Sequence, residues 1–244
     1  MEENRKITLG LGDVSWEQQL GNYYIDMRPA KIHYHNGTYG TKFDKNGVPM
    51  IPTQDGYKYY PVNIAQYGFI LLADYAETKD EKNIETLEQL VKVILAISSE
   101  EEEQIIWWHD YDCLRYGIPA PWASAMAQGE VISFLLRMYQ LSGDKTLLNV
   151  AQKAALFLLN ENHPKRVAVR DENNFLWLEE YPSTPASYVL NGFIYAVFGL
   201  IDLYRISADA TIKKGLDECL STLSKNMHRF DAGYWSYYDL LKKE

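Results

Sequence analysis

Residues 179–182, with the sequence Glu-Glu-Tyr-Pro, hold the side chains best suited to proton transfer. A carboxylate can act as a general base and a tyrosine hydroxyl as a general acid when both lie beside a reacting carbon. If the preceding residues form a strand, Glu179 and Glu180 face opposite sides of it. The alternative is a pair of carboxylates at a solvated strand end. The residues alone leave both interpretations open.

Three side-chain amides recur at similar intervals: Gln66, Gln128 and Asn191 are spaced 62 and 63 residues apart. Each lies near the start of a long apolar segment that is predicted to be a helix. Helix N-termini carry a partial positive charge and unpaired N–H groups. If the three starts face one cleft, they favour an anionic ligand there.

Aromatic residues are abundant, with 19 Tyr and 6 Trp. Many of them lie in two long connections between the predicted helical hairpins, residues 105–121 and residues 167–185. Residues 107–110, Trp-Trp-His-Asp, are either a platform for sugar rings or a loop packed on the helices. Long connections inside a compact domain are usually functional. Arg170, Lys165 and Arg166 flank the β-hairpin expected in the second connection, where they can meet neighbouring anionic sugars.

No metal or cofactor is expected. His33 and His35 fall on one face if their segment is a strand, but no third ligand follows at a recognisable spacing. Nucleophile elbows, phosphate-binding loops and dinucleotide-binding fingerprints are missing from the sequence.

The surrounding elements are predicted to be mostly helical. Residues 1–60 are rich in turn residues and are expected to form an extended N-terminal arm. Residues 61–228 are expected to form three antiparallel helical hairpins within a domain spanning residues 61–244. In each hairpin an apolar inner helix precedes an amphipathic outer helix. A β-hairpin is expected over residues 167–181. The fold class is therefore all-α, an α/α toroid of hairpins with an extended arm and a small β-hairpin.

The outer helices are recognised by apolar residues on one face. Their predicted apolar positions are Ile84, Leu87, Val91 and Ile94, then Leu147, Ala151, Ala154 and Leu158, then Ile212, Leu216, Leu220, Leu223 and Met227.

Charge and composition exclude several classes of protein. A net charge of −9 disfavours binding to nucleic acid or to a membrane surface. Residues 185–201, the longest uncharged run, are better explained as a buried helix than as a membrane span. Cys113 and Cys219 are expected to be reduced thiols, buried or half-buried. The N-terminus lacks a signal-peptide pattern, so a cytoplasmic location is the default expectation.

Five ordered motifs carry a resemblance to a known family: residues 60–68, YPVNIAQYG; 124–129, SAMAQG; 179–185, EEYPSTP; 189–193, VLNGF; and 238–240, YDL. Together they resemble the C-terminal catalytic domain of the D-glucuronyl C5-epimerase family over most of residues 55–240. Members of that family convert D-glucuronate to L-iduronate within a polysaccharide, as in heparan sulfate biosynthesis.

The resemblance implies roles for individual residues. Glu180 and Tyr181 match the catalytic carboxylate–tyrosine pair, Tyr238 matches a further catalytic tyrosine, and Asn191 matches a substrate-contacting asparagine. An acidic polysaccharide is the implied substrate, and no cofactor is implied. The residues expected to bind it are Gln66, Gln128, Asn191, Tyr60, Tyr67, Trp122 and Arg170.

Two departures from the family pattern stand out. Leu241 occupies a position where the family commonly has arginine, and the sequence ends at Glu244, before a fourth helical hairpin. Three hairpins would leave apolar surface bare at an open edge. We therefore expect self-association or a partner chain near residues 61–98 and 205–240.

Two other functions fit the same residues. A uronate lyase or a glycoside hydrolase can also be built on an α/α toroid, and a lyase shares the abstraction of the C5 proton. The second alternative is a non-catalytic paralogue that binds a uronate polysaccharide through an aromatic cleft.

Overall fold

The computed structural model of the protein describes residues 9–243. The chain forms two compact units, an N-terminal unit over Met1–Ile97 and a C-terminal unit over Ser98–Glu244. The described residues form seven α-helices and several small antiparallel strand groups. The structure is thus mostly helical, as expected, but it has more strands than the single β-hairpin predicted. The domain boundary at residue 60 stays a prediction.

The first half of the N-terminal unit is made of short elements, which differ from the extended arm expected there. These are β1 (Gly10–Leu11), β2 (Ile25–Asp26), a 3-10 turn (Arg28–Ala30), α1 (Lys31–His35), a second 3-10 turn (Thr38–Gly40), β3 (Lys42–Phe43), β4 (Pro49–Thr53) and β5 (Gly56–Tyr59). Strands β3, β4 and β5 form an antiparallel sheet in sequence order, and β1 pairs with β2.

Two helices complete the N-terminal unit: α2 (Pro61–Thr78) and α3 (Glu81–Ala96). Pro61 opens α2, where a missing N–H costs nothing. The Asp80 side chain caps α3 by accepting a hydrogen bond from the Lys82 N–H at 3.1 Å. The two helices pack on each other and form the first predicted hairpin.

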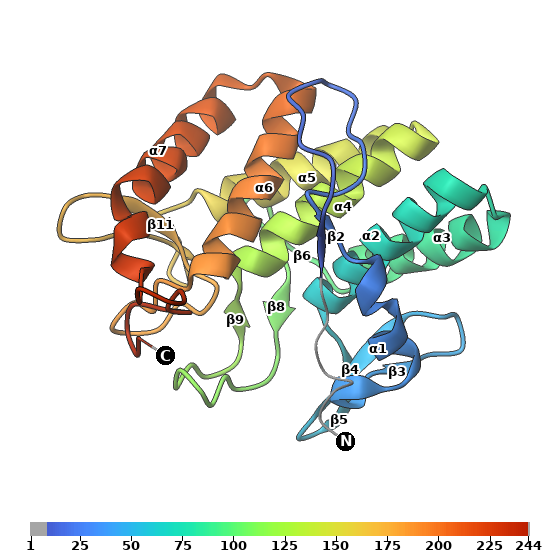
Figure 1. Cartoon of the computed structure of the whole chain (residues 1–244), viewed down its shortest axis with the longest axis horizontal. Helices are drawn as coiled ribbons and strands as arrows, with labels where there is room; N and C mark the ends of the chain where they lie inside the picture. The colour runs from blue at the N-terminus through green and yellow to red at the C-terminus, as the bar shows by residue number, and fades with distance from the viewer. Residues whose placement is uncertain (1–8, 244) are drawn as a thin grey trace. The chain divides into compact units, whose positions relative to one another are not determined.

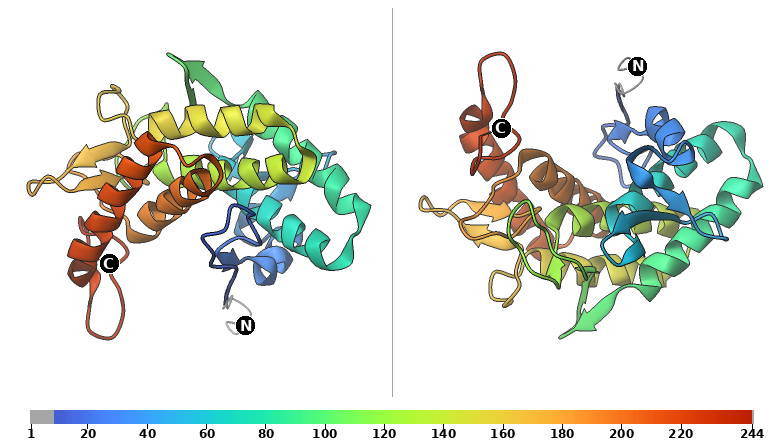
Figure 2. Two further views of the ribbon diagram at one scale, coloured as in Figure 1. Left: turned by 90° about the horizontal axis from the view of Figure 1, so that it is seen from above. Right: turned by 90° about the horizontal axis from the view of Figure 1, so that it is seen from below.

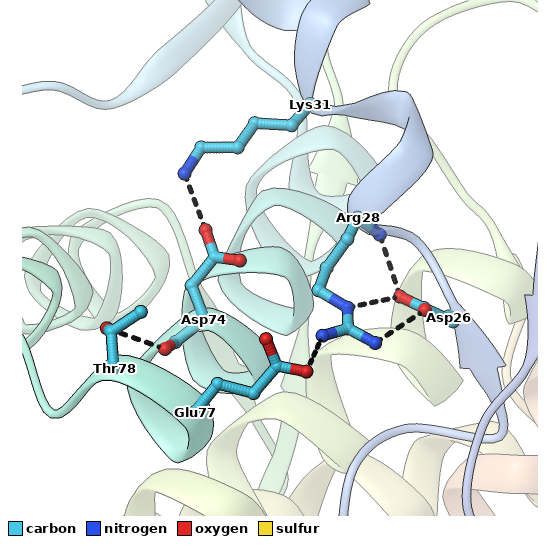
Figure 3. Close-up of polar contacts among 6 residues, drawn as sticks. All are labelled: Asp26, Arg28, Lys31, Asp74, Glu77 and Thr78. Atoms are coloured by element: carbon cyan, nitrogen blue, oxygen red, sulfur yellow. Dashed lines mark hydrogen bonds and ion pairs between the residues drawn. The ribbon is translucent and has the colours of Figure 1, made fainter.

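Charged side chains attach the segment around α1 to helix α2 (Figure 3). The Lys31 ammonium lies 2.5 Å from the Asp74 carboxylate. The Arg28 guanidinium binds the Asp26 carboxylate at 2.8 Å and also pairs with Glu77. These contacts join residues far apart in sequence, so they help to fix the short elements on α2.

The C-terminal unit contains the other two helix pairs. They are α4 (Ala125–Ser142) with α5 (Lys145–Leu158), and α6 (Leu190–Ser207) with α7 (Ala210–Asn226). Helix α4 contacts both α5 and α6 and lies between them (Figure 2). Residues 125–138 of α4 are all buried, as predicted for an inner helix.

Small residues allow α4 and α6 to approach closely. A Cβ atom added at Gly129 would lie 2.4 Å from the Cα of Ala196, and one added at Gly199 would lie 2.5 Å from the Gly129 carbonyl oxygen. Further along the same contact, the Arg137 guanidinium binds the Asp202 carboxylate at 2.6 Å. Arg205 lies 3.4 Å from the same carboxylate. This packing fixes the start of α6 relative to the start of α4.

The apolar face of α7 differs from the prediction. Ile212 and Leu216 are buried, but Leu220 and Met227 are exposed. The buried positions instead include Cys219, Thr222 and Asn226. A buried face must advance by alternating steps of three and four residues, whereas repeated steps of four drift around the helix. In the other outer helices, Leu87, Ile94, Leu147, Ala151, Ala154 and Leu158 are buried as predicted, whereas Ile84 and Val91 are half-buried.

Short strands fill the connections of the C-terminal unit. Strand β6 (Ser99–Glu101) pairs with β7 (Gln104–Ile106), and β8 (Trp108–His109) pairs with β9 (Trp122–Ala123). The predicted β-hairpin is confirmed as β10 (Ala168–Arg170) and β11 (Leu176–Leu178). A 3-10 turn (Met227–Phe230) follows α7.

The N-terminal ends of α4 and α6 and the C-terminal end of α7 lie at the same end of the C-terminal unit (Figure 1). The connection between β8 and β9 and the last residues of the chain lie at that end as well. Among the described residues, no helix has the length and apolarity needed to cross a membrane. The incomplete α/α toroid of three hairpins and the association at its open edge stay predictions.

Candidate functional site

Glu180 follows β11 and is folded inward, with only 4% of the residue exposed. Its side chain lies against Gly192 in the first turn of α6. A Cβ atom at Gly192 would lie 2.3 Å from Glu180 Oε2 and 2.4 Å from Glu180 Cβ. Only a glycine at this position leaves room for the carboxylate beside the positive end of α6.

Two tyrosines accompany the Glu180 carboxylate. The Tyr238 hydroxyl donates to Glu180 Oε2 at 3.4 Å, which is long for a hydrogen bond between oxygens. Burial raises the pKa of Glu180 to about 7, while hydrogen bonds from Tyr181 and Tyr238 oppose the rise. Burial also raises the pKa of Tyr238. The structure thus brings together the three predicted catalytic residues.

Glu179 has a different environment, although it is also buried. Its Oε2 accepts hydrogen bonds from the Ser187 N–H at 2.8 Å and the Ser187 hydroxyl at 2.7 Å, and its Oε1 accepts from the Tyr188 N–H at 3.0 Å. Burial raises the pKa of Glu179 to about 7 against these bonds. Glu179 therefore shapes the loop before α6. The interpretation of the two carboxylates as a solvated strand end is wrong.

The C-terminal segment is attached to the start of α6. The Leu190 N–H donates to the Tyr238 carbonyl at 3.0 Å, and the Leu240 N–H donates to the Ser187 carbonyl at 3.1 Å. Between them, the buried Asp239 accepts a hydrogen bond from the Tyr116 hydroxyl at 2.7 Å. These bonds hold Tyr238 over Glu180.

The connection between β8 and β9 adds residues whose roles the sequence analysis missed. The Tyr116 ring stacks on the Tyr181 ring, with centroids 4.6 Å apart. The Arg115 guanidinium lies over the Tyr238 ring, 5.2 Å from its centroid. The positive charge of Arg115 opposes the rise that burial causes in the pKa of Glu180. The long aromatic connection was the available signal, but nothing in its sequence distinguishes Arg115.

Asn191 and Tyr195 extend the site along α6. Asn191 Oδ1 is buried and accepts no hydrogen bond from the described residues, so it is an acceptor available to a ligand. Burial raises the pKa of Tyr195, and the negative charges of Glu130 and Glu180 add to the rise. Tyr195 therefore belongs to the electrostatic environment of Glu180.

Trp122 packs beside Tyr181 and is buried, with only 3% of the residue exposed. Its ring lies 5.7 Å from the Tyr181 ring and stacks on the His109 ring at 4.1 Å. Its Nε1–H donates to the Tyr111 carbonyl at 2.8 Å. Burial lowers the pKa of His109 to about 4, so the imidazole is neutral at neutral pH. Because Trp107 and His109 are buried, the packed-loop interpretation fits them better than a sugar platform.

The contacts of Gln128 favour a structural role. Its Nε2 donates to the carbonyls of Ile105 and Ala154, and its Oε1 accepts from the Trp107 N–H at 3.0 Å. The side chain is completely buried. A buried amide whose partners are backbone groups stabilises the fold, so these contacts do not support its predicted role in substrate binding.

Arg170 is also occupied. Its guanidinium binds the Glu161 and Glu218 carboxylates, each at 2.7 Å, and the Asn174 carbonyl at 3.1 Å. Two carboxylates already balance its charge, which weakens the case for Arg170 as the contact for an anionic sugar.

The remaining predicted binding residues lie in the N-terminal unit. Tyr60 precedes α2, and Tyr60 and Gln66 are half-buried. Tyr67 is buried against Tyr34 and Phe43, with each ring centroid 5.1 Å away. Burial raises the pKa of Tyr67. These contacts make Tyr67 part of an aromatic cluster within its own unit.

His33 and His35 lie on helix α1 and not on a strand. His35 packs on Phe43, with ring centroids 5.3 Å apart. Within residues 9–243, no group of three His, Cys, Asp or Glu side chains is placed to hold a metal ion. Cys113 and Cys219 are free thiols, half-buried and buried, as predicted.

Comparison with known proteins finds several relatives, two of which are described here. A D-glucuronyl C5-epimerase of Caenorhabditis elegans is 36% identical over 137 residues, covering 50% of this chain and 22% of the relative. An uncharacterized protein of Methanocaldococcus jannaschii is 26% identical over 204 residues, covering 76% of this chain and 66% of the relative. The chain thus spans less than two thirds of each relative.

The family match covers the whole candidate site. A family model described as the D-glucuronyl C5-epimerase C-terminus matches residues 101–244. This range is more than half of the chain and includes Glu180, Tyr181, Asn191 and Tyr238. The chain therefore belongs to the D-glucuronyl C5-epimerase C-terminal family.

Proposed function

We propose that the protein is a uronate C5-epimerase that converts D-glucuronate residues of a polysaccharide to L-iduronate. The observation that carries this proposal is a buried carboxylate with a pKa of about 7, Glu180, in contact with the hydroxyls of Tyr181 and Tyr238. A base with a pKa near neutral suits proton abstraction at neutral pH. The family membership supports the same reaction.

In this mechanism Glu180 removes the C5 proton of the uronate. A carboxylate acidifies its α-proton only weakly, because the resulting intermediate carries a second negative charge. Burial makes Glu180 a stronger base than a free glutamate, since its pKa rises from 4.5 to about 7. Its position against Gly192 keeps the carboxylate in one orientation.

A tyrosine returns a proton to the opposite face of C5. The Tyr238 hydroxyl keeps its proton at neutral pH because burial raises its pKa. A sugar ring does not fit between Tyr238 Oη and Glu180 Oε2 while they are 3.4 Å apart, so substrate must replace this long hydrogen bond. Apo contacts of catalytic groups are often loose and rearrange when substrate binds. After turnover, proton transfer from Glu180 to Tyr238 restores the starting state.

The charge that develops on the uronate needs positive groups nearby. Arg115, whose charge already acts on Glu180 and Tyr238, supplies a full positive charge. The first turn of α6 supplies N–H groups and the positive end of the helix dipole. Asn191 Oδ1, buried and without a donor among the described residues, can accept a hydrogen bond from a sugar hydroxyl.

Two measurements on a glucuronate polymer in heavy water test the mechanism: deuterium incorporation at C5 and formation of L-iduronate. Glu180→Gln should reduce both by about 10²- to 10⁴-fold, the usual cost of losing a general base. Tyr238→Phe should suppress iduronate formation while Glu180 still exchanges the C5 proton on the original face. Tyr237→Phe, which alters the neighbouring tyrosine, is the matched control and should retain both activities.

Other outcomes would identify the alternative functions. Wild-type protein that binds the polymer but incorporates no deuterium is a binding protein, and the epimerase proposal then fails. An unsaturated product without iduronate indicates a lyase, which would expel the C4 oxygen after the same proton abstraction. Wild-type exchange rates in Glu180→Gln would remove Glu180 from the mechanism.

A further inference from the structure

Residues 113–118, which we call the Tyr116 loop, form a closed turn beside the candidate site. The Cys113 N–H donates to the Ile118 carbonyl at 2.8 Å, and the Ile118 N–H donates to the Cys113 carbonyl at 3.1 Å. The Tyr116 N–H donates to the same Cys113 carbonyl at 3.2 Å. Hydrogen bonds within the loop therefore hold the backbone of Tyr116 in place.

Two parts of the Tyr116 side chain contact two different segments of the site. Its ring stacks on the Tyr181 ring, with centroids 4.6 Å apart and 17° between the ring planes. Its hydroxyl donates to Asp239 Oδ2 at 2.7 Å, and Asp239 directly follows Tyr238. A hydrogen bond to a charged carboxylate is stronger than one between neutral groups. One side chain thus contacts the ring of Tyr181 and fixes the residue next to Tyr238.

Further contacts join the C-terminal segment to the Tyr116 loop. The Lys242 Nζ donates to the Arg115 carbonyl at 2.9 Å and lies over the Tyr116 ring, 5.0 Å from its centroid. The Lys242 N–H donates to Asp239 Oδ1 at 2.5 Å. Asp239 is completely buried, and a buried carboxylate that loses a donor is costly. The hydrogen bond from Tyr116 therefore fixes the segment strongly.

Glu180 and Tyr238 are held by different parts of the C-terminal unit. The Glu180 carboxylate is oriented by its close approach to Gly192 in α6. The position of Tyr238 depends on the C-terminal segment, which Tyr116 binds through Asp239. Loss of the Tyr116 hydroxyl should therefore displace the tyrosine and leave the carboxylate where it is.

We propose that Tyr116 is a positioning residue that determines on which face of C5 the proton is returned, because its hydrogen bond to Asp239 holds Tyr238 in place. This inference rests on the proposed function, in which Glu180 breaks the C5–H bond and takes the proton. With the hydrogen bond intact, the Tyr238 hydroxyl supplies the proton for the new C–H bond, and L-iduronate forms. Without it, Glu180 returns a proton to the original face, and D-glucuronate is recovered.

The test is the amount of L-iduronate formed per deuterium incorporated at C5 of a glucuronate polymer in heavy water. Tyr116→Phe keeps the ring that stacks on Tyr181 and removes only the hydroxyl. This ratio should fall about 10- to 100-fold, the effect of a small displacement of a reacting group. The KM for the polymer should change little. A purely structural role would reduce the amount of folded protein, lower both quantities together and leave the ratio unchanged.

Tyr59→Phe in the N-terminal unit is the matched control. The Tyr59 hydroxyl donates to Asp44 Oδ2 at 2.8 Å, so this variant loses the same kind of hydrogen bond. It should keep the wild-type ratio of iduronate to deuterium even if its stability falls.

Asp239→Asn provides a second test, which is needed if Tyr116→Phe does not fold. Asparagine keeps the size of the side chain but removes the charge that strengthens the hydrogen bond from Tyr116. The ratio should fall in the same direction. Adding Tyr116→Phe to Asp239→Asn should lower it no further than the more severe single variant, because both changes act through one hydrogen bond.

The outcomes separate this inference from the proposed function. Wild type that forms iduronate while Tyr116→Phe keeps the wild-type ratio overturns the role of Tyr116 and leaves the epimerase proposal standing. The role is also overturned if the effects of the two variants multiply when they are combined. Wild type that neither exchanges the C5 proton nor forms iduronate overturns both.

Discussion

Glu180 carries a carboxylate that water barely reaches, since only 4% of the residue is exposed. Burial penalises its charged form more than the two tyrosine hydroxyls stabilise it, so its pKa rises from 4.5 to about 7. Burial of the Glu180 carboxylate lowers the stability of the folded protein, and it produces a base that works near neutral pH.

The first prediction concerns the stability cost of Glu180. The pKa of Glu180 is higher in the folded protein than in the unfolded chain. Between pH 4.5 and about 7, the folded protein therefore binds more protons than the unfolded chain. The free energy of unfolding therefore falls as the pH rises through this window. Glu180→Gln should stabilise the protein by up to about 3 kcal/mol at alkaline pH and by little at acidic pH. Urea unfolding on both sides of the window measures this.

A matched control for this variant is Glu172→Gln in the turn between β10 and β11, where the side chain is exposed. It should change stability little at either pH. Equal effects of Glu180→Gln at both ends of the pH window would contradict the assigned origin of the pKa rise.

The second prediction concerns the pH dependence of the reaction. A general base must be deprotonated, so kcat/KM for C5 exchange should rise about tenfold per pH unit below the pKa of Glu180 and level off above it. The pKa of Glu180, about 7, sets the midpoint. Because burial raises the pKa of Tyr238, the plateau should extend into the alkaline range. Initial rates of exchange across this range measure the profile, and a rate that falls from acidic to neutral pH would exclude Glu180 as the base.

At the scale of elements, the first turn of α6 connects the parts of the site. It accommodates the Glu180 side chain at Gly192, carries Asn191, and binds the C-terminal segment through the Leu190 N–H. Close packing of α6 on α4 through Gly129 and Gly199 fixes the position of this turn. The site thus depends on packing along the full length of α6.

The third prediction tests the space at Gly192. In Gly192→Ala the new Cβ would lie 2.3 Å from Glu180 Oε2, so the carboxylate must move. A displacement of this size should reduce C5 exchange by about 10²-fold. Exchange assays on folded variant protein measure the effect.

Gly215→Ala on α7 is the matched helical control for Gly192→Ala. Its Cβ would lie 2.6 Å from Leu159 Cδ1, at the end of a flexible side chain. It should keep the exchange activity even if the stability changes. Full activity in Gly192→Ala would show that the close approach of Glu180 to α6 is not needed.

At the scale of the whole molecule, net charge and local charge oppose each other. The chain carries −9 overall, yet Arg115 lies beside Tyr238, where an anionic polymer is proposed to bind. Modest salt screens the long-range repulsion between the acidic chain and the anionic polymer. More salt is needed to weaken the short-range attraction between the cationic side chains and the polymer.

The fourth prediction is a salt optimum for polymer turnover. The Debye length falls from about 30 Å at ~0.01 M salt to about 10 Å at ~0.1 M, which removes the long-range repulsion first. We therefore expect kcat/KM to rise over this range and to fall again toward ~1 M salt, where screening reaches about 3 Å. Initial rates along a sodium chloride series measure this. A steady decrease from the lowest salt would mean that the net charge does not hinder binding.

Sequence pattern alone determined the helices and the hairpin. The apolar periodicity predicted three helix pairs, and the turn residues between two short apolar runs predicted strands β10 and β11. These features follow from local spacing, because one face of a helix or strand must be buried. The periodicity failed on α7, where Leu220 and Met227 are exposed and Cys219 and Thr222 are buried. On α7 the helical spacing was compatible with two different buried faces, and tertiary packing determined which of them is buried.

Only the tertiary structure decided the environment of the candidate site. From the sequence alone, Glu180 could have lain at the end of a solvated strand. In the structure it is buried by helix α6 and by the C-terminal segment. That segment is held by the hydrogen bond between Tyr116 and Asp239, which are 123 residues apart in sequence. Contacts over such separations leave no local pattern, so the sequence could indicate neither the position of Arg115 beside Tyr238 nor the backbone partners of the Gln128 amide, whose role in substrate binding stays a prediction. A pKa depends on desolvation and on nearby charges, and both are set by residues that the fold brings together from distant positions.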